Sequence, residues 1–367
     1  MSDLIQAKEF FLQGVELFEH GQLEAAHGQF ERALALAPGR PSVLLNLGIT
    51  RMQLGRWQEA VAPLQESLSQ QPEQLDGWIA LGMVLNRIGD LEQALQAYAQ
   101  VQRLAPGHAQ GWGEAASLLR EMNRLDEAAD LYARALAIEP DHELYRYYLS
   151  ALRGQDGPAQ PPRAYVQSLF EQYADDFEPH LLGPLQYQGH SRLIAHLPEQ
   201  APSHFARVLD LGCGTGLCGP LIRGRAGLLW GIDLAQGMLD QASQRGVYDQ
   251  LQQADATQFL SQCQEPWHLV LAADVFIYIG ALEPLFEQLA RLMPSQGWLA
   301  FTAELDESGL AQHRPRLLPS LRYAHPLSYL QGCAQAHGFE WHSHHQAPLR
   351  LDQGKSLMAM YAYLRRR

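Results

Sequence analysis

The stretch that decides the fold is VLDLGCGTGLCG, Val208–Gly219, an apolar run that ends in an acid and then turns through glycines. Read from Gly214, it has the G-x-G-x-x-G spacing of a dinucleotide-binding turn. Read from Gly212, it is acid-x-G-x-G-x-G, with Asp210 two residues before the first glycine. Both interpretations place a tight turn after a parallel strand, at the sheet edge where nucleotide ligands bind. The two interpretations differ in the charge of the ligand that the turn would hold.

Asp210 favours a cationic ligand over a pyrophosphate. Two like charges about 4 Å apart cost about 4 kcal/mol at an effective dielectric constant near 20. A second acid, Asp233, ends the next apolar run and suits ribose hydroxyls in either interpretation. A third, Asp255, could accept a hydrogen bond from an adenine amino group. S-adenosylmethionine, cationic at one end and adenosine at the other, accounts for all three acids.

The second half of the chain alternates short apolar runs with helical stretches. Five runs predict parallel strands with crossover helices on both faces: ARVLDLG, GLLWGIDL, LQQAD, HLVLAADVF and GWLAFTAEL. Two later runs, HGFEWHSHH and SLMAMYAYL, flank the polar stretch APLRLDQGK and predict a hairpin. The expected fold is a Rossmann-like α/β domain, with a mostly parallel seven-strand sheet and a C-terminal antiparallel hairpin.

The first half is an internal repeat with a period of 34 residues. Four sets of positions keep this period: Gly14, Gly48, Gly82 and Ala116; Ala26, Ala60, Ala94 and Ala128; Phe30, Leu64, Tyr98 and Tyr132; Pro38, Pro72, Pro106 and Pro140. The pattern resembles the tetratricopeptide repeat, in which paired helices stack into an all-α solenoid. The expected domains are residues 1–153 (four repeats plus a closing helix), a Gly- and Pro-rich linker at 154–163, and 164–367.

The second half resembles the class I S-adenosylmethionine-dependent methyltransferases. The matching segments are VLDLGCGTG, GIDLAQGMLDQA, ADA and LVLAADVFIYIG. Together with the repeats and with YVQSLFEQYADDFEPHLLGPLQY, they resemble the tetratricopeptide-containing methyltransferases. The resemblance implies a helical lid at 164–200, with Tyr173 and Phe177 toward the substrate. It also implies that S-adenosylmethionine is bound by Asp210, Gly212, Cys213, Gly214, Asp233, Leu234, Met238, Asp255, Ala256 and Ala273.

The methyl acceptor should enter near the end of the fourth strand and the segment after the fifth. Tyr278 and His325 are the candidate catalytic residues there, with Arg322 and Tyr323 as candidate substrate contacts. An arginine beside a tyrosine and a histidine could seat a carboxylate or place a proton acceptor. The same cluster could equally be a solvated loop. The histidines of WHSHH alternate along a strand, so no metal site is expected.

Composition restricts the possible partners and compartment. The chain carries a formal net charge of −13, which disfavours nucleic acid as a partner. No apolar run is long enough to span a membrane, and no secretory signal precedes the first helix. The four cysteines have irregular spacing, so reduced thiols and a cytoplasmic location are expected.

Three functions remain open from the sequence. The enzyme could methylate a protein or peptide captured in the apolar groove of the repeats. It could instead methylate a small molecule, with the repeats serving in docking or in a homodimer. The second half could also bind the cofactor in an adaptor without catalysis. The acceptor atom is not evident from the residues.

Overall fold

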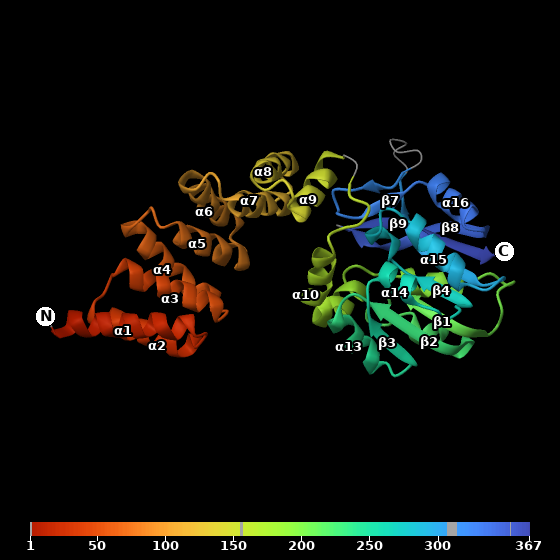
Figure 1. Ribbon diagram of the computed structural model, residues 1–367, viewed down its shortest axis with the longest axis horizontal. Coiled ribbons are helices and arrows are strands. Elements are labelled where there is room, and N and C mark those ends of the chain that lie inside the picture. The colour runs from red at the N-terminus through yellow and green to blue at the C-terminus, as the bar shows by residue number, and fades with distance from the viewer. Residues whose placement is uncertain (1, 155–156, 307–313, 353) are drawn as a thin grey trace. The chain divides into compact units, whose positions relative to one another are not determined.

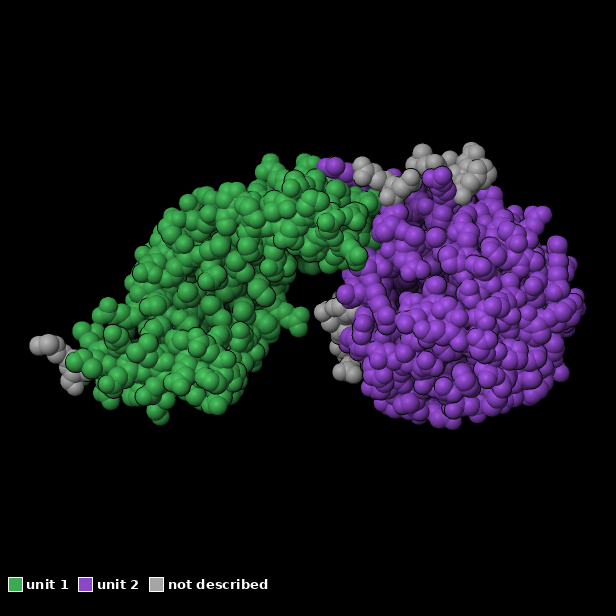
Figure 2. All heavy atoms as spheres, in the orientation of Figure 1, with its two compact units in different colours: residues 1–152 green, residues 153–367 purple. Residues whose placement is uncertain are grey.

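The computed structural model divides the chain into two compact units, Met1–Leu152 and Arg153–Arg367 (Figure 2). It describes residues 2–154, 157–306, 314–352 and 354–367, without the side chains of residues 2, 168, 172–177 and 352. Within these ranges, none of the helices combines the length and apolar character needed to cross a bilayer.

In its described residues, the first unit is entirely helical (Figure 1). Its helices are α1 (Ser2–Glu19), α2 (Leu23–Leu36), α3 (Pro41–Gln53), α4 (Trp57–Gln70), α5 (Leu75–Arg87), α6 (Leu91–Leu104), α7 (Ala109–Glu121), α8 (Leu125–Ile138) and α9 (Glu143–Arg153). Helices α1 to α8 pack as four consecutive pairs. The expected solenoid of helix pairs is confirmed, and α9 follows the fourth pair.

The glycines of the repeat allow close helix contact. A Cβ at Gly48 would lie 2.6 Å from Cγ of Leu64, and a Cβ at Gly82 would lie 2.9 Å from Cζ of Tyr98. Both partners are almost fully buried. Because the interior is close-packed, a side chain at either glycine would separate the helices of its pair. The small residue and the large residue of each period are therefore one packing unit.

The second unit is built on a nine-stranded sheet with the order β3-β2-β1-β4-β5-β7-β6, and with β9 and then β8 paired beside β5. The strands are β1 (Phe205–Leu211), β2 (Ala226–Asp233), β3 (Gln250–Gln253), β4 (Leu269–Ala272), β5 (Trp298–Leu305), β6 (Arg316–Leu317), β7 (Tyr323–His325), β8 (Phe339–Asp352) and β9 (Lys355–Arg366). The helices are α10 (Arg163–Leu182), α11 (Gly189–Ala195), α12 (Gly219–Ile222), α13 (Gln236–Gln244), α14 (Ala256–Gln262), α15 (Glu283–Leu292) and α16 (Leu327–Ala336), with short 3-10 turns η1 (Arg223–Arg225) and η2 (Phe276–Tyr278).

The central strands are apolar on both sides because helices cover both faces of the sheet. Leu209 packs in a core with side chains of α14, α15 and α16, whereas Val208 packs in a second core with α11 and α12. Strands β1 to β5 and β7 run parallel where they pair, and β9 runs antiparallel to β5. The expected Rossmann-like fold with a terminal hairpin is confirmed, with two short strands, β6 and β7, in addition.

The expected linker is only partly a linker. The hydroxyl of Tyr323 donates to the carbonyl oxygen of Pro158 at 2.6 Å, and the amide of Ala281 donates to that of Ala159 at 2.9 Å. A Cβ at Gly157 would lie 3.0 Å from the side chain of Leu317. Residues 157–162 therefore pack against the second unit, which corrects the expected boundary at residue 164.

Candidate functional site

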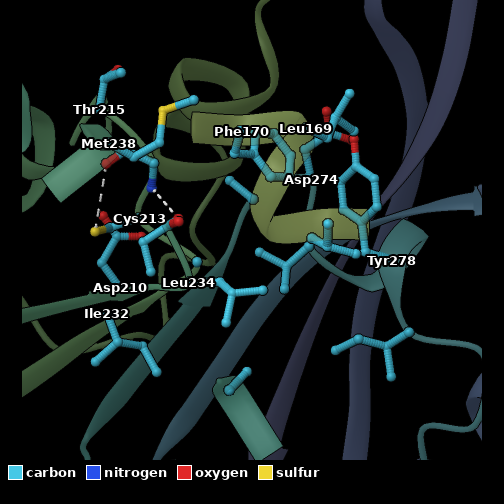
Figure 3. Close-up of a pocket in the computed structure, with 18 of the residues that line it drawn as sticks. Leu169, Phe170, Asp210, Cys213, Thr215, Ile232, Leu234, Met238, Asp274 and Tyr278 are labelled. Carbon is cyan, nitrogen blue, oxygen red and sulfur yellow. Dashed lines mark hydrogen bonds between the residues drawn. The ribbon is translucent and has the colours of Figure 1, made fainter. Parts of the chain in front are cut away.

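A cavity of about 430 Å³ lies at the carboxyl ends of β1, β2 and β4. Its volume is in the usual range of small-molecule sites. Figure 3 shows Asp210, Cys213 and Leu234 on one side of it and Tyr278 on the other. All ten residues predicted to bind the cofactor line it: Asp210, Gly212, Cys213, Gly214, Asp233, Leu234, Met238, Asp255, Ala256 and Ala273. The separate sequence motifs thus meet in one site.

The glycine loop presents bare backbone to this cavity. Gly212 has φ +65°, and a Cβ there would lie 2.6 Å from Cγ2 of Val275. Gly214 has φ +54°, and a Cβ there would meet no atom within 4 Å. Gly212 is therefore required by packing and conformation, whereas a side chain at Gly214 would project into open space at the cavity. Such a cradle suits a ligand that lies directly on the loop.

Asp233 joins the loop to the end of β2. Its Oδ2 accepts a hydrogen bond from the amide of Gly214 at 2.9 Å, and its Oδ1 accepts one from Ala235 at 3.0 Å. Burial raises the pKa of Asp233, and these two amides act in the opposite direction. Each carboxylate oxygen keeps a second lone pair. A fixed acid with free acceptor capacity fits the hydroxyls of a ribose.

Asp210 is not the fixed charge that the sequence suggested. It is only 1% exposed, and its Oδ2 accepts a hydrogen bond from the hydroxyl of Tyr248 at 2.6 Å. Burial raises the pKa of Asp210 to about 7, with the hydrogen bond from Tyr248 lowering it and Asp233 raising it. The carboxyl group is therefore part protonated near neutral pH, and a cationic ligand would favour its ionised form.

Cofactor affinity should consequently depend on pH. Below the pKa of Asp210, binding a cation requires the loss of a proton, so we expect affinity about tenfold weaker at pH 6 than at pH 8. Calorimetry with S-adenosylmethionine across this range checks the expectation. Tyr248→Phe should move the transition to higher pH, because it removes a hydrogen bond that lowers the pKa of Asp210. An unchanged affinity from pH 6 to pH 8 would contradict this assignment.

Asp255 has a structural role beside its expected contact with adenine. It is the N-cap of α14, and its Oδ1 accepts a hydrogen bond from the amide of Gln258 at 2.9 Å. N-capping fixes the orientation of the carboxylate. The hydrogen bond to adenine stays a prediction.

Helix α10 covers the cavity, as expected of the lid. Leu169 and Phe170 line the cavity, and the Phe170 ring meets the Tyr278 ring edge-on at 5.4 Å. The side chains of Tyr173 and Phe177 lie outside the described residues, so their contact with the substrate stays a prediction.

Two glutamates connect this helix to the cofactor side of the cavity. Glu171 accepts hydrogen bonds from the amides of Gln236 and Gly237, at the first turn of α13, at 2.8 and 3.1 Å. Glu178 pairs with Arg245 at 2.6 Å, and Arg245 also donates to the carbonyl oxygen of Thr215 in the glycine loop. A carboxylate at a helix N-terminus is stabilised by the exposed amides and the helix dipole. These contacts join α10 to α13 and to the glycine loop, and a lid role for α10 stays a prediction.

Glu171→Ala should therefore loosen the lid without altering the cofactor contacts themselves. Loss of a capping carboxylate costs about 0.5–2 kcal/mol, so we expect cofactor dissociation to accelerate by about two- to thirtyfold. Stopped-flow displacement of S-adenosylhomocysteine measures this rate. Glu287→Ala, at an exposed position on α15 that does not line the cavity, is the matched control. Equal rates in both variants would show that Glu171 does not hold the lid.

Tyr278 and Arg322 both line the cavity, and their roles toward an acceptor stay predictions. Burial raises the pKa of Tyr278 to about 12; Asp274 raises it further, whereas Arg322 and Arg350 lower it. The hydroxyl therefore stays protonated at neutral pH. It is suited to donating a hydrogen bond, not to accepting a proton from a substrate.

The structure corrects the roles expected of Tyr323 and His325, because neither lines the cavity. The Tyr323 hydroxyl donates to the carbonyl of Pro158. His325 is fully buried, with Nε2 2.9 Å from the carbonyl oxygen of Ile279, so this nitrogen carries the proton. Burial also lowers the pKa of His325 to about 4. Pairing of β7 with β5 places this histidine inside the fold, where it cannot act on a substrate.

Sequence reasoning missed an ion pair at the same end of the cavity. Arg350, on β8, is only 7% exposed, and its Nη1 donates to Oδ2 of Asp274 at 2.7 Å. Asp274 follows β4 and has φ +61°, uncommon for a residue other than glycine. Its amide donates to the hydroxyl of Thr302 at 2.7 Å. The sequence contains no local pattern that predicts this ion pair, because Arg350 lies in APLRLDQGK, which was expected to be a loop.

The histidines of WHSHH form ring contacts. His345 stacks on Tyr361, and Nδ1 of His344 accepts a hydrogen bond from the Trp341 indole at 3.1 Å. Among the residues that the structure describes, no three His, Cys, Asp or Glu side chains are grouped so as to hold a metal ion.

Comparisons with known proteins agree with this architecture. A methyltransferase domain model matches residues 208–297, and two tetratricopeptide repeat models match residues 11–76 and 88–152. The chain is 29% identical to a malonyl-[acyl-carrier protein] O-methyltransferase of Enterobacter lignolyticus (strain SCF1), over 43% of this chain and 57% of that protein. It is 35% identical to methyltransferase-like protein 27 of Homo sapiens, over 25% of this chain and 38% of that protein. The chain thus spans 57% or less of the length of these relatives.

Two solved structures are similar to parts of the chain. Magnesium protoporphyrin IX methyltransferase from Synechocystis PCC 6803, with bound SAH, is similar at 18% identity and a TM-score of 0.44, over 56% of this chain and 99% of that chain. YrrB, a tetratricopeptide repeat protein, is similar at 24% identity and a TM-score of 0.37, over 38% and 72%.

The bare backbone at Gly214, the acceptor oxygens of Asp233 and the ionisable Asp210 fit S-adenosylmethionine as the cofactor of this cavity. The matched family models agree with the sheet and with the repeats. Residues 208–297 therefore match a methyltransferase domain and residues 11–76 and 88–152 match tetratricopeptide repeats, on a second unit with an α/β methyltransferase fold and a first unit of helix pairs.

Proposed function

We propose that this protein transfers the methyl group of S-adenosylmethionine to a protein substrate that its repeats capture. The observation that carries the proposal is the presence, on one chain, of a cofactor-sized cavity and a separate repeat unit. When bound, the cofactor supplies a methyl group activated by the positive sulfur. The protein's contribution is alignment of the reactants and exclusion of water, worth roughly 7–11 kcal/mol in well-oriented systems.

Different residues of the second unit bind the cofactor, exclude water and orient the acceptor. Asp233 and Asp210 hold the ribose and the cationic end of the cofactor, and Phe170 of α10 shields the cavity from water. Tyr278 faces the acceptor with a protonated hydroxyl. A hydrogen bond from Tyr278 would orient the acceptor.

The first unit offers an apolar surface on the first helix of each of its first three pairs, α1, α3 and α5. The side chains expected to line its groove are half-buried against the repeat cores, except Met83, which is 41% exposed: Phe11, Val15, Phe18, Leu45, Ile49, Met52, Ile79 and Met83. Partly exposed apolar side chains in a row suit a hydrophobic segment of a partner. The name of the Enterobacter relative includes a carrier protein, which supports delivery of an acceptor by a protein.

Tritiated S-adenosylmethionine and a cell extract test the proposal with the full chain. We expect label in acid-precipitated protein, reduced at least fivefold in Met83→Glu. Ile138→Glu, at another exposed apolar side chain of the first unit but on α8, should leave labelling unchanged. Label confined to the acid-soluble fraction would favour a small-molecule methyltransferase. Cofactor binding without label in any fraction would favour a non-catalytic adaptor.

A further inference from the structure

Two arginines reach the acceptor end of the cavity from different parts of the fold. Arg322 lies just before β7 and Arg350 lies on β8, and both line the cavity beside Tyr278. Both guanidinium groups lower the pKa of Tyr278, as nearby cations do. The far end of the cavity therefore combines two cations and a hydroxyl donor.

Arg350 has unused hydrogen-bonding capacity. Its Nη1 is paired with Asp274, but Nη2 is buried and has no hydrogen-bond partner among the residues that the structure describes. A buried donor without a partner is unfavourable, because its lost hydration is not replaced. An oxygen anion beside Arg350 would recover this cost, because a guanidinium binds carboxylates through two parallel N–H groups.

The arginines are also the cations among the cavity-lining residues that act on Tyr278. Asp274 pairs with Arg350, and Glu304, which does not line the cavity, also raises the pKa of Arg350, so the guanidinium groups present their remaining N–H donors on the cavity side. The other lining aspartates, Asp210, Asp233 and Asp255, belong to the loop and strand ends assigned to the cofactor. Three of the lining aspartates thus lie on the cofactor side, and Arg322 and Arg350 act on Tyr278.

We propose that the methyl acceptor is a carboxylate, bound by Arg322 and Arg350 and methylated on oxygen. This inference rests on the proposed methyl transfer. One carboxylate oxygen forms a bond to the methyl carbon while the carbon–sulfur bond breaks, and the sulfur keeps the electron pair of that bond. The products are a methyl ester and a neutral thioether. No proton is transferred, since a carboxylate is ionised at neutral pH.

This chemistry agrees with the groups at the acceptor end. Tyr278 is protonated and His325 lies outside the cavity, so neither serves as a base there. An ionised carboxylate needs none, whereas an amine or alcohol acceptor would have to lose a proton.

The stability of the product to alkali tests the inference. Label transferred from tritiated S-adenosylmethionine by the full chain should be released as volatile methanol by mild alkali, because methyl esters hydrolyse under these conditions. Alkali-labile label in precipitated protein identifies a protein carboxylate, and alkali-labile label in the soluble fraction identifies a small acid. Alkali-stable label overturns the carboxylate inference and leaves methyl transfer standing. Absence of all label overturns both.

Ligand-observed NMR provides a readout that does not depend on turnover. Propionate should show saturation transfer from the full chain, and the neutral isostere propionamide should not. Arg322→Met should reduce the propionate signal at least threefold. Arg350→Lys should also reduce it, because lysine keeps a charge beside Asp274 but loses the planar fork. Unchanged affinity for S-adenosylhomocysteine would show that both variants are folded. Equal signals from propionate and propionamide would overturn the inference.

Discussion

Asp233→Ala is expected to weaken cofactor binding by at least about 100-fold and to abolish methyl transfer at ordinary cofactor concentrations. The substitution removes the acceptor for the amides of Gly214 and Ala235 and the acceptors available to a ribose. Hydrogen bonds to a charged group contribute about 1.5–3 kcal/mol each, so two lost contacts are sufficient for this effect. Calorimetric titration with S-adenosylhomocysteine measures the affinity directly.

Asp249→Ala is the matched control for this variant. Asp249 also accepts a backbone amide hydrogen bond, from Leu229 at 2.7 Å, and it pairs with Arg223. It does not line the cavity. We expect Asp249→Ala to lower stability and to leave cofactor affinity unchanged. Comparable losses of affinity in both variants would mean that the effect of Asp233 acts through folding alone.

Gly212→Ala should destabilise the second unit by about 2–5 kcal/mol and reduce cofactor affinity at least tenfold. Two penalties add at this position. The backbone has φ +65°, where a Cβ costs about 1–2 kcal/mol, and the new methyl group would lie 2.6 Å from Val275. Relief of this contact requires either the loop or the end of β4 to move. Both border the cavity, so binding should change together with the free energy of unfolding in urea.

Gly246→Ala separates the penalty for a positive φ from the penalty for the steric contact. Gly246 has φ +64°, almost the same as Gly212, but a Cβ there would meet no atom within 4 Å. It does not line the cavity. We expect this variant to lose only about 1–2 kcal/mol of stability and to bind the cofactor normally. If Gly246→Ala were as damaging as Gly212→Ala, the contact with Val275 would have no part in the effect.

The fold was predictable wherever local pattern and tertiary structure agree. The 34-residue period reflects contacts such as Gly48 with Leu64, which lie within one helix pair and are repeated along the chain. Strand β8 was predicted too short because Pro348 and the charged residues of APLRLDQGK are typical of a loop. In the structure β8 pairs with β9, with a register shift between Pro348 and Arg350, and no second strand pairs with β8 among the described residues. At an edge strand the missing N–H of proline breaks no ladder.

The candidate site was predictable on the cofactor side and less so on the acceptor side. Asp210, Asp233 and the glycines lie at strand ends whose position follows from the alternation of strands and helices. Arg350, Tyr248 and Glu171 act across 76, 38 and 65 residues of sequence on Asp274, Asp210 and Gln236, respectively. Such pairings depend on the packing of the whole unit. His325 is the opposite case. Arg322, Tyr323 and His325 are neighbours in the sequence, but the pairing of β7 with β5 buries His325 away from the cavity that Arg322 lines.

The docked segment 157–162 affects how the second unit can be prepared alone. Gln160 and Pro161 form part of the wall around the ligand space, and the preceding carbonyl groups satisfy Tyr323 and Ala281. A shortened protein that begins at residue 164 would lack part of this wall and would lack the carbonyl groups to which Tyr323 and Ala281 donate. Low affinity in such a fragment would then report damage at the cut, not dependence on the repeats, so excision should begin before Gly157.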